Sequence, residues 1–113
     1  MTTSSPWVPA ECTLSTVDRP LRVAEFDSLF TSDVRSVDRI SSGRVRLELR
    51  PDPAVAFRTA NLAARETGCC AFFGFTLAMV EGRLTLDVTA TPAHTDVLAA
   101  LADRAEALAG RPA

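Results

Sequence analysis

The chain has 113 residues, a length that favours a single domain with a core large enough to fold without disulfides or metal ions. Its 14 acidic residues outnumber 12 basic ones, all of them arginine, which argues against nucleic acid and acidic membranes as partners because both bind basic patches. The sequence contains neither an apolar run long enough to span a membrane nor a secretory signal. We therefore expect a cytoplasmic protein whose cysteines serve as thiols, metal ligands or redox groups.

The N-terminal part predicts an extended arm followed by a helix. Residues 1–17 are rich in serine, threonine and proline and carry Cys12, so we expect them to lie across the domain. Asp18 and Pro20 are typical of a helix start. Apolar residues then recur every three or four positions and predict a helix over residues 18–32.

Residues 34–68 are predicted to form two strands and a helix. A weak strand over 34–40 precedes the alternating stretch 44–50, whose apolar side chains would face a core. The helix is expected over about residues 53–67. Gly68 is interpreted as the left-handed residue that closes this helix.

Residues 72–109 are predicted to repeat this order of elements. The stretch 72–80 is the most apolar strand, and residues 81–82 form a two-residue hairpin turn. An alternating strand over 83–89 follows, and a final helix begins at the Thr-Pro pair at residues 91–92.

A shift of 39 residues aligns the two halves without a gap. Leu47 then falls on Leu86, and Pro53 falls on Pro92. We interpret this as an internal duplication, although alternating strands and helix-starting prolines can also recur by necessity. The predicted fold is α+β: an N-terminal helix, then two ββα repeats that form one four-stranded, largely antiparallel sheet packed by helices.

Adjacent thiols at Cys69 and Cys70 form the candidate functional site. Under the same shift they fall on Leu108 and Ala109, so the ββα unit itself does not require them. Soft thiolates suit Cu(I) and Zn(II), and by the same softness Hg(II) and As(III). Cys12 is the available third thiolate. The alternative is that the pair is packed as small hydrophobic side chains.

Two further residues are weaker candidates. His94 begins the last helix and is interpreted as satisfied by local polar groups, with metal ligation as the alternative. Glu66 lies one turn before Cys70, where it would be an acceptor or proton carrier for the thiols, or else a surface glutamate. Because the pair follows a helix C-terminus, the helix dipole raises the pKa of its thiols and disfavours nucleophilic catalysis.

The stretch Glu66–Leu77 resembles a group of small, mostly uncharacterised bacterial proteins. They share an acidic residue, a Cys-Cys pair, a proline and aromatic residues, with an upstream Cys-x-Leu that Cys12-Thr13-Leu14 matches. Here Ala71 replaces the usual proline, and Gly68 stands where the acidic residue usually directly precedes the pair. The resemblance implies a loose association with heavy-metal handling. The ββα repeat is also similar, at the level of fold, to the core shared by organomercurial lyases and copper-binding lipoproteins.

Three hypotheses follow from the sequence. The first is binding of a soft metal or metalloid through Cys12, Cys69 and Cys70, for sequestration, delivery or sensing. The second is an enzyme similar to an organomercurial lyase, with Cys12 and Cys70 as thiolates and Glu66 as proton donor. The third is a redox or protein-interaction module with structural cysteines. The sequence leaves a homodimer open.

Overall fold

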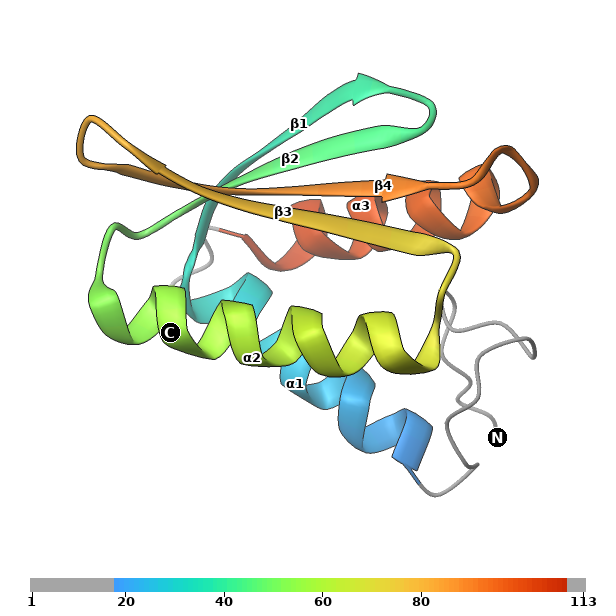
Figure 1. Ribbon diagram of the computed structural model, residues 1–113, viewed down its shortest axis with the longest axis horizontal. Coiled ribbons are helices and arrows are strands. Elements are labelled where there is room, and N and C mark those ends of the chain that lie inside the picture. Colours follow the sequence, from blue (N-terminus) through green and yellow to red (C-terminus); the bar gives the residue numbers. More distant parts are fainter. Residues whose placement is uncertain (1–17, 110–113) are drawn as a thin grey trace.

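The computed structural model of the chain (Figure 1) describes the backbone of residues 18–109 and the side chains of residues 22–109 except that of Cys69. The predicted arm, residues 1–17, lies outside the described residues, and Cys12 lies outside them with it.

Residues 18–109 form a four-stranded antiparallel sheet with helices on one side of it (Figure 1). The elements are, in chain order, α1 (Asp18–Ser32), β1 (Val34–Ser41), β2 (Arg44–Leu49), α2 (Pro53–Cys69), β3 (Phe73–Val80), β4 (Arg83–Ala90), the 3-10 turn η1 (Pro92–His94) and α3 (Thr95–Leu108). The strands lie side by side in the order β1-β2-β4-β3. The predicted α+β fold, a helix followed by two ββα repeats, is confirmed.

The two repeats are related by the same 39-residue shift in the structure as in the sequence. β3 begins at Phe73, 39 residues after β1 begins at Val34, and α3 ends 39 residues after α2. The two central strands, β2 and β4, pair so that Leu47 lies directly opposite Leu86. These two leucines are counterparts under the shift, so an approximate two-fold axis passes between them.

The core lies between the sheet and the helices. Alternate residues of β2 and β4 point toward the helices, as the period of two along a strand requires. Buried side chains from both layers fill the space, namely Val45, Leu47, Leu49, Leu84, Leu86 and Val88 from the strands with Phe26, Phe30, Val55, Leu62, Leu98 and Leu101 from the helices. Burial of each such side chain stabilises the fold by about 1.5–3 kcal/mol.

α2 starts as its sequence predicts but ends later. The Asp52 side chain caps it by accepting a hydrogen bond from the backbone N–H of Ala54 at 2.8 Å. Gly68 is helical, and the helix continues to Cys69. The backbone N–H of Cys70 still donates to the carbonyl of Glu66 at 2.7 Å, with Cys70 at φ −125°. The prediction that Gly68 closes the helix in a left-handed conformation is therefore wrong.

In the second repeat, the hairpin turn forms where it was predicted, but the α-helix begins later than predicted. Glu81 and Gly82 both have positive φ, 52° and 77°, which suits the twist of a two-residue hairpin between β3 and β4. The predicted helix start at residues 91–92 is instead the beginning of η1, and the α-helix proper begins at Thr95.

Candidate functional site

Cys70 lies at the joint between α2 and β3, at the C-terminal cap of the helix. Its backbone N–H closes the last helical turn on Glu66, and its carbonyl accepts a hydrogen bond from the N–H of Phe73 at 3.1 Å. The side chain is only 1% exposed and belongs to the core. Both backbone bonds hold Cys70 in place between the two elements.

Cys70 is disulfide-bonded in the structure. The sequence instead led us to expect free thiols, since a reducing compartment disfavours disulfides. Cys12 and the side chain of Cys69, the other two predicted thiolates, lie outside the described residues. The disulfide means that a second cysteine sulfur is bonded to that of Cys70.

Glu66 is fully buried, with 0% of its surface exposed, so its interpretation as a surface glutamate is wrong. One carboxylate oxygen, Oε1, accepts a hydrogen bond from Nη1 of Arg22 at 2.7 Å. The other oxygen, Oε2, has no hydrogen-bond partner in the structure. Burial raises the pKa of Glu66 above its ordinary value, and the Arg22 guanidinium lowers it in part.

Glu66 and Cys70 lie on the same face of the chain. Residues four apart on a helix are neighbours, about 5–6 Å between Cβ atoms. The hydrogen bond from Cys70 to the Glu66 carbonyl keeps this helical spacing up to the cap. Both side chains are buried, with 0% of Glu66 and 1% of Cys70 exposed. A buried carboxyl group therefore lies four residues before the disulfide-bonded cysteine in the chain.

Arg22 is the residue that sequence reasoning missed. It lies on α1 and is only 8% exposed, and it carries the one described charge that contacts Glu66. Its Nε also lies 3.5 Å from Oε1 of Glu25. The sequence offers a weak signal for this role, since an arginine among the apolar positions of an amphipathic helix needs an acidic partner.

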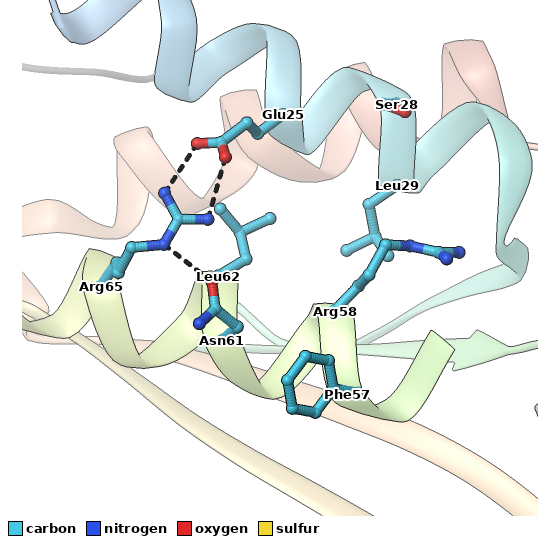
Figure 2. A pocket seen from close by; sticks show the side chains of 8 residues that line it. All are labelled: Glu25, Ser28, Leu29, Phe57, Arg58, Asn61, Leu62 and Arg65. Carbon is cyan, nitrogen blue, oxygen red and sulfur yellow. Dashed lines mark hydrogen bonds and ion pairs between the residues drawn. The ribbon is translucent and has the colours of Figure 1, made fainter. Parts of the chain in front are cut away.

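The ion pairs continue from Arg22 into a pocket between α1 and α2 (Figure 2). Glu25 accepts two hydrogen bonds from Arg65, at 3.0 and 2.9 Å, and Arg65 donates a third to Asn61 at 2.9 Å. The pocket holds about 270 Å³ and lies beside Phe57, with Arg58 and Arg65 in its wall. Both arginines already bind carboxylates, Arg58 that of Asp33 and Arg65 that of Glu25. The Glu25–Arg65 ion pair links α1 to α2, and both arginines of the pocket wall are already paired with carboxylates.

His94 is held by local contacts in the described structure. Its ring stacks on that of Phe72, with centroids 4.1 Å apart and an interplanar angle of 8°. Its Nδ1 lies 3.0 Å from the hydroxyl of Thr91. His94 thus lies against the segment that follows Cys70. The described residues contain no cluster of three or more histidine, cysteine, aspartate or glutamate side chains able to hold a metal ion.

Comparisons with known proteins identify no relative. No protein-family model, no curated protein and no solved structure gives a significant match to the chain. Among the described residues, no helix is both long enough and apolar enough to cross a lipid bilayer.

Proposed function

We propose that the protein binds a soft metal or metalloid ion through the thiolate of Cys70 and that of the cysteine bonded to it, once their disulfide is reduced. The observation that carries the proposal is the disulfide at Cys70. Two sulfurs that are close enough to bond are close enough to share one ion after reduction. The role would be sequestration, delivery or sensing of that ion.

The chemistry of the pair favours soft ions. Thiolates bind Cu(I), Zn(II), Hg(II) and As(III) more readily than hard cations. An arriving metal ion drives the deprotonation of the thiols that bind it. The burial of Cys70 excludes water that would compete for the ion. The third cysteine of the chain would close a three-coordinate site, and Cys12, Cys69 and Cys70 together make up that donor set.

Reduction would control binding. The oxidised pair has no thiolate to offer, so only the reduced protein would bind. A cytoplasmic setting, which we propose for the working protein, supplies the reductant as an external thiol that is itself oxidised to a disulfide. Binding would therefore depend on both the ion and the redox state of the cysteine pair.

Equilibrium titration of the reduced full-length chain with Cu(I), Zn(II), Hg(II) and As(III) tests the proposal. We expect a 1:1 complex with at least one ion, and roughly a 100-fold weaker complex in the Cys69→Ala/Cys70→Ala variant. His94→Ala is the matched control, and it should bind like the parent. Equal affinity of the double variant and the parent would remove the proposal. Cys12→Ala then shows whether the third thiol contributes.

A second candidate function is favoured by Glu66. Glu66 is a buried carboxyl group with one oxygen that has no hydrogen-bond partner, and such a group near a thiolate pair can supply the proton needed to cleave a carbon–mercury bond. The Glu66 proton would pass to the departing carbon, the carbon–mercury bond would break, and Hg(II) would stay on the two thiolates. Water would then reprotonate Glu66.

Release of hydrocarbon from an organomercurial tests this second candidate. We expect Glu66→Gln to lower turnover by about 100-fold or more while Hg(II) binding persists. Glu25→Gln is the matched control, because Glu25 contacts the same Arg22 from an exposed position. Turnover no faster than that of a free dithiol would leave ion binding as the function.

A further inference from the structure

β3 forms one edge of the sheet and carries no charged residue. It spans Phe73–Val80, and its pairing with β4 runs through eight consecutive residues without a register shift. Its outer edge has no strand partner within residues 18–109. Near its end, Met79 and Val80 are 68% and 61% exposed. A straight, apolar edge of this kind is a template for another strand.

β1, the opposite edge, is protected against such pairing. It carries Arg35, Asp38 and Arg39, and its register with β2 shifts twice. Charges and irregularities are the devices by which edge strands avoid intermolecular pairing. Arg39 lies opposite Val45 in β2, as Met79 lies opposite Leu84 in β4. Because the register of β1 shifts next to Arg39, the counterpart of Met79 in the sequence is the following residue, Ile40. The duplication thus gives the sheet two equivalent edges, of which only one is protected.

The helices beside the two edges also differ in the charge of their side chains. Arg39 extends from β1 to α3, where it donates to Asp103 at 2.6 Å and to Glu106 at 2.8 Å. The α2 residues 39 positions before these two acids are Ala64 and Thr67. α2 therefore has small, uncharged side chains where α3 has an ion-paired acidic cluster. Its arginines lie instead on the side that faces α1 (Figure 2).

We propose that the β3 edge binds the β3 edge of a second copy of this chain, so that two sheets join into one of eight strands. The edge is complementary to itself. Antiparallel pairing about Thr76 places Phe75 opposite Leu77 of the partner subunit and Phe73 opposite Met79 of the partner subunit, and it brings no like charges together. The small residues of α2 leave room for the partner's α2 at about 8–10 Å.

The size of this face indicates a reversible dimer. A strand of eight residues is about 27 Å long, and the sheet and the helix layer together are about 20 Å deep. The face is then on the order of 500 Å² per copy, which is in the range of small, transient interfaces. Because β3 contains no cysteine, the proposed dimer contact does not depend on the proposed ion binding.

Sedimentation equilibrium of the full-length chain tests the dimer. We expect the parent to form dimers in the range of about 10–100 μM, and Met79→Lys to weaken association by roughly 10-fold or more, because a lysine on an edge strand opposes pairing. Ile40→Lys is the matched control. Ile40 is the counterpart of Met79 under the 39-residue shift and is 48% exposed on β1, so the control should associate like the parent.

Val80→Lys provides a second test at the same edge, and circular dichroism checks that every variant is folded. A parent chain that remains monomeric at about 200 μM would overturn the proposal. Equal association of Met79→Lys, Val80→Lys and Ile40→Lys would overturn it as well.

Discussion

Gly68 and Gly82 have opposite effects on stability, because one lies inside a helix and the other in a tight turn. Gly68 lies within α2, and a Cβ built there meets no atom within 4 Å. Gly82 also has open space around it, but its φ of +77° is a conformation that residues with a side chain rarely adopt. The first glycine costs the helix conformational entropy, whereas the second permits the hairpin turn.

Gly68→Ala should stabilise the protein by about 0.5–1 kcal/mol, because alanine is the better helix former and the site has room for its methyl group. Urea denaturation of the parent and the variant measures the change. Gly82→Ala is the control, and it should lose about 1 kcal/mol because of its positive φ. A loss of stability in Gly68→Ala would mean that a glycine is needed next to the cysteines.

At the scale of elements, the buried pair Arg22–Glu66 joins α1 to the end of α2 beside Cys70. Burial raises the pKa of Glu66, so its ionised form is less favoured in the folded protein than in the unfolded chain. A carboxyl group with a raised pKa makes its full contribution to the free energy of unfolding at pH values below its ordinary pKa. That contribution is lost as the pH rises through the raised pKa of the folded state. Arg22 offsets that loss.

Arg22→Met should destabilise the protein by about 3 kcal/mol at pH 8, because it leaves a buried carboxylate without its partner. The loss should shrink near pH 5, where Glu66 is protonated more readily once Arg22 is absent. Glu25 keeps Arg65, which lowers its pKa, and it stays ionised over this range. Urea titrations at both pH values measure the effect.

The double variant Arg22→Met/Glu66→Met separates the ion pair from the packing of the two side chains. With both charges removed, stability should return to within about 1 kcal/mol of the parent and should lose its difference between pH 5 and pH 8. A single variant that is equally destabilised at both pH values would show that the Arg22 stem, rather than its charge, holds α1 in place.

At the scale of the whole molecule, the fold was predictable because its periodic patterns agree with one another. The alternation in 44–50 and 83–89, the proline-started helices and the 39-residue shift all indicate one ββα unit used twice. The ends of elements were less predictable. α2 runs past Gly68 because Cys70 can still donate to Glu66, a contact that depends on where β3 begins.

The candidate site was only partly predictable. The position of Cys70 next to Glu66 follows from helical spacing, but the burial of Glu66 does not. That burial depends on Arg22, which is 44 residues away in the chain and pairs with Glu66 only after α1 has packed. No local pattern indicates such a contact, so the sequence left open whether Glu66 serves the thiols or lies on the surface.

The most direct test of the central claim compares As(III) binding by the oxidised and the reduced chain, measured by native mass spectrometry. The reduced parent should retain one arsenic atom per chain, while the oxidised parent and reduced Cys70→Ala should retain little, with affinities about 100-fold lower. Equal retention of arsenic by the oxidised parent, the reduced parent and Cys70→Ala would contradict the assignment of Cys70 and its bonded cysteine as the binding site.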